Sequence, residues 1–239
     1  CVCSTIHARE MSIRALPGTR IANPATGAIV YSPPEGADVI RDKLSEWERF
    51  VHADDGVDPL VRMAAAHYQF EAIHPFSDGN GRTGRILNVL MLVEAGLLYL
   101  PVLYLSRYII QTKDDYYRLL REVTSDGNWE EWILYLLTGV ERTSAATVAK
   151  IGATRELQAD FARRARAASK GGADAEFLAV LFEQPYCRIA DVMTRCEVSR
   201  PTATKYLATL QGAGQLAVEQ AGREKLYVNT GFLEILRGV

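Results

Sequence analysis

Twelve residues, HPFSDGNGRTGR from His74 to Arg85, separate two stretches with helical periodicity. Glycine is unfavourable inside helices, yet Gly79, Gly81 and Gly84 all fall within this short segment. Because glycine has no Cβ, the backbone can turn its N–H groups toward one point there. A helix that follows adds the positive end of its dipole. The segment therefore predicts an anion site, built to hold a phosphate, between two helices.

The charged side chains of the segment extend this prediction. Arg82 and Arg85 lie three apart on one helical face and can both reach phosphate oxygens. Asp78 is unexpected beside an anion unless Mg²⁺ bridges its carboxylate to the phosphate. His74, held outside the helix by Pro75, is suited to act as a general base near its unperturbed pKa. Together these residues predict transfer of a group from a nucleotide phosphate to a hydroxyl.

Each part of the segment alone has a simpler interpretation. A lone glycine-rich turn is usually only a turn, and a lone histidine is more often structural. The Walker arrangement is absent, because no lysine in the chain follows a glycine. GNGRTG follows a helical stretch rather than a strand, which argues against a dinucleotide-binding fold. The joint occurrence of base, acid, glycines and arginines favours the catalytic interpretation.

The segment resembles the signature of Fic-domain proteins, H-x-F-x-D/E-G-N-G-R-x-x-R, and matches every fixed position. The resemblance extends over about residues 13–140, with TGAIVYSPPEG similar to the family's flap at about 20–34. It implies a protein adenylyltransferase, which transfers AMP from ATP to a Ser, Thr or Tyr hydroxyl of a target protein. Relatives that transfer phosphate typically replace Gly79 and Gly81, which this chain keeps. Other relatives transfer UMP or phosphocholine, and the motif alone does not distinguish their donors from ATP, so these reactions are alternatives.

The resemblance also implies a role for each residue of the motif. His74 would deprotonate the acceptor hydroxyl, and Asp78 would hold Mg²⁺. The remaining motif positions would bind the phosphates of ATP: Gly79, Asn80 and Gly81 at the α and β phosphates, Arg82 and Arg85 at the β and γ phosphates, with Thr83 and Gly84 between the arginines.

Tyr116 and Tyr117 lie in DDYYRLLREV, which is similar to the helix that lines the nucleotide base. Adjacent residues of a helix point about 100° apart, so only one of the two can face a given pocket. We expect one tyrosine in the core and the other stacked on the base, without assigning which. The family often has an asparagine a turn or two later, where this chain has Thr124.

The pattern of elements predicts a mainly α fold, a Fic helical domain with a small β-hairpin flap followed by a winged-helix domain. We expect a catalytic domain over residues 1–140 and a helical linker over 141–172 that breaks at Gly171-Gly172. A winged-helix-like domain should follow over 173–239. The expected helices cover about 37–52, 58–73, 83–95, 113–123, and a stretch from Asn128 to Lys170.

The apolar run ILNVLMLVEAGLLYLPVLYL, residues 86–105, is long enough to suggest a membrane span. Asn88, Glu94 and Pro101 interrupt it. A helix that is apolar on most sides also suits the centre of a large helical domain. We therefore expect a buried core helix and no membrane partner.

A different class of function, a DNA-binding regulator, would act through residues 173–239. The helix beginning at Ser199 would read the groove, with Arg223 and Lys225 on the wing. This region carries seven basic and eight acidic residues, where a DNA-binding face should be clearly basic. We therefore favour target recognition or dimer contact for it, and nucleic acid remains the alternative. Self-modification and a homodimer are further expectations about partners.

Net charge and cysteine usage add the expected compartment. The formal net charge of -2 gives no overall basic footprint for nucleic acid. Four sparse cysteines without zinc spacing suit a reducing compartment. No secretory signal pattern is found, and we expect a cytoplasmic protein.

Many Fic proteins carry an inhibitory helix, S/T-x-x-x-E-G/N, whose glutamate pairs with the second arginine of the motif. Thr230 with Glu234 has this spacing, but Ile235 follows, so we interpret the match as chance. The usual upstream position would lie before residue 1, and we expect the chain to be a piece of a longer one. The resemblance thus implies an Arg85 that is free to hold the γ-phosphate.

Overall fold

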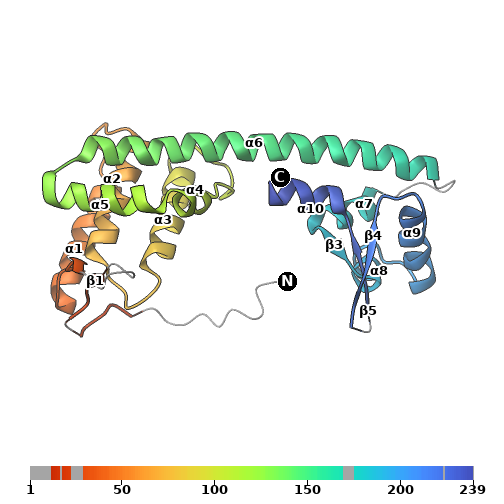
Figure 1. Cartoon of the computed structure of the whole chain (residues 1–239), viewed down its shortest axis with the longest axis horizontal. Coiled ribbons are helices and arrows are strands. Elements are labelled where there is room, and N and C mark those ends of the chain that lie inside the picture. The colour runs from red at the N-terminus through yellow and green to blue at the C-terminus, as the bar shows by residue number, and fades with distance from the viewer. Residues whose placement is uncertain (1–11, 17, 23–28, 169–174, 223, 239) are drawn as a thin grey trace. The chain divides into compact units, whose positions relative to one another are not determined.

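The computed structural model describes residues 12–16, 18–22, 29–168, 175–222 and 224–238. The chain divides into two compact units, Cys1–Ala145 and Ala146–Val239. Helices dominate both units, as Figure 1 shows, so the predicted mainly α fold class is confirmed.

The first unit is a group of helices with one short hairpin. Helix α2 packs against both α1 and α3 (Figure 1). Strands β1 (Ile21–Ala22) and β2 (Ile29–Tyr31) pair antiparallel. They lie within the predicted flap, of which residues 23–28 are outside the described residues. The helices are α1 (Ala37–Val51), α2 (Pro59–Ile73), α3 (Asn80–Glu94), α4 (Leu105–Gln111), α5 (Lys113–Asp126) and the first part of α6 (Trp129–Ala168).

Helix α2 begins and ends where the sequence predicts. The Asp58 side chain accepts hydrogen bonds from the first turn, and Pro59 occupies the first helical position. The helix ends because the residue before Pro75 is disfavoured in the α region. His74 instead takes the left-handed conformation, with φ 50°. This turn delivers the histidine to the end of α2.

Helix α3 begins at Asn80, earlier than the expected start near residue 83. Gly79 alone among the three motif glycines has a positive φ, 87°. Gly81 and Gly84 are helical and face α2, and a Cβ at Gly84 would lie 2.8 Å from Glu71 Oε1. The prediction that all three glycines form a turn is therefore wrong. Two of them serve the close approach of α2 and α3.

The expectation of a buried core helix is wrong for much of the apolar run, although the helix itself ends near residue 95, as expected. Helix α3 ends at Glu94, and Tyr99 and Ile86 are 100% and 59% exposed. The inward face of α3 is occupied by residues at four-residue spacing, Asn80, Gly84, Asn88 and Leu92, so Ile86 and Leu90 lie on exposed sides of the helix. Across the described residues, no helix combines the length and apolar character that a membrane span requires.

An aromatic core holds α2, α5 and α6 of the first unit together. Trp132 of α6 is fully buried, and its indole Nε1 donates to the Ala64 carbonyl over 2.8 Å. His67 stacks on the Trp132 ring with centroids 6.0 Å apart. Gly139 lies on α6 where a Cβ would come within 2.6 Å of the Tyr108 ring. These contacts fix the helices on which the candidate site is built.

The second unit combines helices with a three-stranded antiparallel sheet of order β3-β5-β4. Its core includes Phe161 and Ala165 from α6. The structure therefore begins this unit at Ala146, within the linker expected over 141–172, and the expected break at 171–172 lies outside the described residues. Its elements after α6 are α7 (Ala175–Glu183), β3 (Tyr186–Cys187), α8 (Ile189–Arg195), α9 (Arg200–Gly212), β4 (Ala217–Ala221), β5 (Glu224–Val228) and α10 (Thr230–Arg237).

Candidate active site

A cavity of about 390 Å³ opens between the end of α2, the start of α3 and one face of α5. Its α5 wall consists of residues three and four apart, which a helix places on one side. The lining residues are Tyr31, Glu71, Ala72, His74, Gly81, Arg85, Tyr116, Tyr117, Leu120, Arg121, Thr124 and Ser125. The structure thus brings His74, Gly81, Arg85 and both tyrosines of the predicted site to one cavity.

Arg14 fixes the backbone of the turn that carries His74. Its guanidinium donates to the carbonyl oxygens of His74 over 2.7 Å and Ile73 over 3.3 Å, and also to that of Pro34. The Arg14 backbone N–H donates to the Pro75 carbonyl over 2.9 Å. Only 6% of Arg14 is exposed. Sequence reasoning missed this residue, because nothing local marks an isolated arginine some sixty positions before its partner.

Burial lowers the pKa of the His74 imidazole from its usual value, and the charge of Arg14 adds to the decrease. The Glu71 backbone acts in the opposite direction. A lowered pKa keeps the ring neutral at neutral pH, which is the form that accepts a proton. The environment of His74 therefore suits a general base.

The start of α3 leaves its first backbone N–H groups without a side-chain cap. The side chain of Asn80 is occupied elsewhere, since it accepts from Phe76 N over 2.9 Å and donates to Phe76 O over 2.8 Å. Asn80 can thus serve a phosphate only through its backbone. Thr83, whose N–H donates to Gly79 O, and Gly84, which faces α2, do not line the cavity. The predicted phosphate-binding role of these two residues stays a prediction.

Asp78 and Arg82 form an exposed ion pair at the motif. Arg82 Nη2 lies 3.0 Å from Asp78 Oδ2, with 71% and 88% of the two side chains exposed. The other carboxylate oxygen of Asp78 accepts from Gly79 N over 2.7 Å. Arg82 contributes to a second cavity of about 380 Å³, which it shares with Arg85.

The single carboxylate of Asp78 is enough to help hold a Mg²⁺ ion that binds together with a nucleotide. Mg²⁺ usually takes one or two carboxylates together with substrate phosphates and waters. Within the part of the chain that the structure describes, no three His, Cys, Asp or Glu side chains gather at a metal-binding spacing. Asp78 is exposed and next to the uncapped start of α3, so its carboxylate is accessible to a Mg²⁺ bound to phosphate there.

Arg85 is held by a neutral partner. Its Nε donates to Ser106 Oγ of α4 over 2.9 Å, and the side chain is half-buried. It makes no ion pair with the described residues. Because the hydroxyl of Ser106 does not neutralise the guanidinium, Arg85 keeps its charge for an anion.

The structure distinguishes the two tyrosines. Tyr116 is 4% exposed, and its hydroxyl lies 3.0 Å from His67 Nε2. Tyr117 is 48% exposed, with Lys113 Nζ 5.9 Å from its ring centroid. Tyr116 therefore has the core position, and Tyr117 is the one whose ring is accessible for stacking. The stacking role itself stays a prediction.

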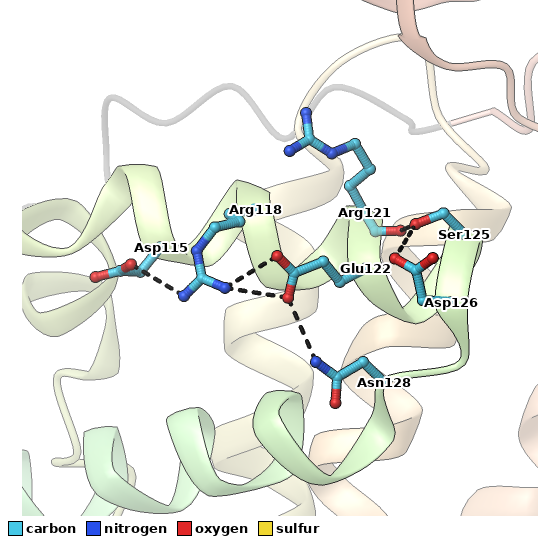
Figure 2. A network of polar contacts seen from close by, with 7 residues as sticks. All are labelled: Asp115, Arg118, Arg121, Glu122, Ser125, Asp126 and Asn128. Atoms are coloured by element: carbon cyan, nitrogen blue, oxygen red, sulfur yellow. Dashed lines mark hydrogen bonds and ion pairs between the residues drawn. The ribbon is translucent and has the colours of Figure 1, made fainter.

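Figure 2 shows two arginines of α5 in different situations. Arg118 is bonded to Asp115 and Glu122, and Glu122 also accepts from Asn128. The Arg121 guanidinium points away from this network and has no contact to the other residues drawn (Figure 2). Arg121 lines the cavity, so it adds a positive charge that sequence reasoning did not anticipate.

Two segments of the chain match known families. Residues 6–92 match the Fic/DOC family, and residues 157–232 match the C-terminal domain of the "Protein adenylyltransferase SoFic-like" family. The chain is 33% identical over 112 residues to the protein adenylyltransferase Fic of Culex quinquefasciatus, a match that covers 46% of this chain and 21% of that protein. A similar match, 31% identical over 115 residues, covers 47% of this chain and 22% of the Drosophila virilis protein of the same name.

The chain spans about a fifth of the length of these two curated relatives. Among solved structures, a Fic family protein from Desulfovibrio desulfuricans G20 aligns with 91% of this chain and 62% of its own, with 19% identity and a TM-score of 0.49.

Proposed function

We propose that this chain, which carries a Fic/DOC-family domain over residues 6–92 and a SoFic-like domain over residues 157–232, is a protein adenylyltransferase. The reaction would transfer AMP from ATP to a Ser, Thr or Tyr hydroxyl of a target protein. The names of its relatives support this activity. The observation that carries the proposal is one cavity lined by His74, by the start of α3 and by Arg85. The lowered pKa of His74 favours its neutral form, and the hydrogen-bond partner of Arg85 is a neutral hydroxyl.

His74 would act on the acceptor hydroxyl. The hydroxyl oxygen attacks the α-phosphorus of ATP while its proton passes to the neutral imidazole. The bond from the α-phosphorus to the bridging oxygen breaks, and pyrophosphate leaves with that oxygen. The products are the AMP ester of the target side chain and pyrophosphate, and His74 later returns its proton to solvent.

The phosphates would bind at the start of α3. The uncapped N–H groups after Gly79 and the helix dipole attract the anion. Arg85 would pair with the terminal phosphates, and Arg82 would join it on leaving Asp78. Asp78 would hold Mg²⁺, which supplies positive charge that offsets the charge of the phosphates.

The α5 wall would accommodate the base. Tyr117 offers an exposed ring, and Thr124 offers a hydroxyl already bonded to the hydroxyl of Tyr68 over 2.9 Å. Both groups tolerate more than one base, so UTP and CDP-choline are the donors against which ATP has to be compared. For the second unit, whose order of helices and strands suits a winged helix, we propose target recognition or dimer contact in the cytoplasm.

A labelling experiment tests the proposed function. The protein is incubated with Mg²⁺ and either ATP or UTP labelled at the α-phosphate, or CDP-choline labelled in its choline. Label should become protein-bound from ATP, in this chain itself or in an added lysate. His74→Ala should lose transfer by about 10² to 10⁴ and still bind ATP. His52→Ala, which changes an exposed histidine outside the cavity, is the matched control. Incorporation only from UTP or CDP-choline, or full activity of His74→Ala, would contradict the proposal.

A further inference from the structure

The cavity contains a buried carboxyl group that the proposed reaction does not use. Glu71 lies three residues before His74 on α2, and only 8% of it is exposed. Its Oε1 has no hydrogen-bond partner among the described residues. A buried charged group without a partner is costly. Its presence in a cavity for an anionic ligand therefore requires an explanation.

Glu71 and Arg85 approach the same point of α3. A Cβ at Gly81 would lie 3.7 Å from Glu71 Oε1 and 3.1 Å from Arg85 Nη1. The two side chains are thus neighbours without a direct ion pair, and Arg85 Nε is bonded to Ser106 instead. They are close enough for the charge of Arg85 to act on the carboxyl of Glu71.

Burial raises the pKa of the Glu71 carboxyl to about 7, and the nearby Arg85 guanidinium opposes the increase. The carboxyl therefore changes its charge near neutral pH when the cavity is empty. Phosphates that bind Arg85 would remove the cation that stabilises the carboxylate and add negative charge beside it. Both effects favour the protonated carboxyl.

The other titratable groups around Glu71 do not change charge in the same way. Burial lowers the pKa of His67 to about 4, so that ring is neutral from pH 6 upward. Burial raises the pKa of Tyr116 well above its usual value, and Tyr116 keeps its proton. His74 has a lowered pKa, and Arg121 is an arginine and stays charged. Above pH 7, Glu71 is the one of these groups expected to titrate.

We propose that Glu71 is a positioning residue for Arg85. Its carboxylate attracts the guanidinium while the cavity is empty, and the carboxyl takes up one proton from solvent when the phosphates of a nucleotide pair with Arg85. Binding of the nucleotide is therefore coupled to protonation of Glu71, and its affinity falls as the pH rises above 7. The inference rests on the proposed function only in taking a nucleotide phosphate as the anion.

The test measures binding without transfer. An ATP analogue with a methylene bridge between the α and β phosphorus atoms cannot donate AMP. Its binding with Mg²⁺ is followed by titration calorimetry at pH 6.5 and 8.0, in buffers of different ionisation enthalpy, which report proton uptake. For the wild type, Kd should rise by about threefold or more over this range, with proton uptake at pH 8.0.

Glu71→Gln carries a permanently neutral side chain of the same shape. At pH 8.0 it should bind the analogue about fivefold more tightly than the wild type and without the proton uptake. Glu131→Gln, which changes an exposed glutamate of α6 outside the cavity, should behave as the wild type. The titration of the analogue itself is common to all three proteins and cancels in the comparison.

The inference would be overturned if Glu71→Gln bound the analogue with the same affinity, the same pH dependence and the same proton uptake as the wild type. If circular dichroism shows that Glu71→Gln does not fold, the measurement on the wild type is sufficient. An absence of proton uptake by the wild type at pH 8.0 would also overturn the inference. Proton-linked binding without any transfer to protein would support the inference and contradict the adenylyltransferase proposal. No binding to the wild type would overturn both.

Discussion

The guanidinium of Arg14 donates a 2.7 Å hydrogen bond to the backbone carbonyl of His74. The same side chain reaches the carbonyls of Ile73 and Pro34, so it ties the end of α2 to the segment after β2. These bonds hold the left-handed turn that presents the imidazole. Arg14 is thus a structural support of the candidate base.

Removing Arg14 should destabilise the first unit and lower activity. Arg14→Ala leaves buried carbonyls without a charged donor, so we expect a loss of about 2–4 kcal/mol in the free energy of unfolding. Urea unfolding followed by tryptophan fluorescence measures this. Arg41→Ala, which breaks an exposed pair with Asp38, should cost no more than about 0.5 kcal/mol. Equal effects of the two substitutions would contradict this account.

The pH profile should report the lowered pKa of His74. A general base must be neutral, so kcat/KM, measured at subsaturating ATP, should fall as the pH drops through the pKa of His74 in the free protein. Because burial lowers this pKa, the midpoint should lie below the usual value of about 6.5. Single-turnover rates between pH 5 and 8 test the prediction. A midpoint above 6.5 would show that burial does not determine the pKa of His74.

Asp78 should matter through the metal. Asp78→Asn removes the negative charge that would hold Mg²⁺ and releases Arg82 from its ion pair. We expect transfer to fall by about tenfold or more and the half-saturating Mg²⁺ concentration to rise. A magnesium titration of the transfer rate measures both. Unchanged magnesium dependence with tighter ATP binding would reassign Asp78 as a cap for the start of α3.

Arg85 should contribute more than Arg82. Loss of a charge-assisted contact costs about 1.5–3 kcal/mol, so Arg85→Ala should reduce transfer by at least about tenfold. Arg82 is 71% exposed and already paired with Asp78, so we expect a smaller loss from Arg82→Ala. Arg107→Ala, an exposed change on α4, serves as the control. A larger loss from Arg82→Ala would reverse the proposed roles.

Gly139 and Gly152 of α6 should respond in opposite ways to alanine. A Cβ at Gly139 would meet the Tyr108 ring at 2.6 Å, whereas nothing lies within 4 Å of one at Gly152. Gly139→Ala should therefore destabilise by about 1–3 kcal/mol. Gly152→Ala should stabilise by up to about 1 kcal/mol, the difference in helix propensity. Thermal unfolding by circular dichroism checks both, and stabilisation by Gly139→Ala would contradict the packing.

The sequence predicts the parts of the site that local chemistry determines. Asp58 followed by Pro59 starts α2, and Pro75 ends it, because capping and proline sterics act over a few residues. The motif from His74 to Arg85 carries its signal in its own composition. The motif's placement at the junction of α2 and α3 follows from the same residues.

The parts that the sequence did not predict depend on contacts between distant residues. Arg14 and Glu71 are single charged residues, and only the fold brings them to the motif. The exposed apolar residues of α3 were misjudged because the inward face of that helix includes small and polar residues such as Gly84 and Asn88. Periodicity finds a helix, but the neighbour decides which face is buried.

Helix α3 starts without a side-chain cap, at Gly79 in the left-handed conformation. The first N–H groups of a helix need partners, so a bound phosphate would itself be the missing cap. Occupancy of the site is then coupled to the order of the first turn, which should fray in the empty protein and tighten with ligand. Amide hydrogen exchange at Asn80, Gly81 and Arg82 would slow in proportion to bound nucleotide. The backbone N–H groups that bind the phosphate would thus also report, through their exchange rates, whether nucleotide occupies the site.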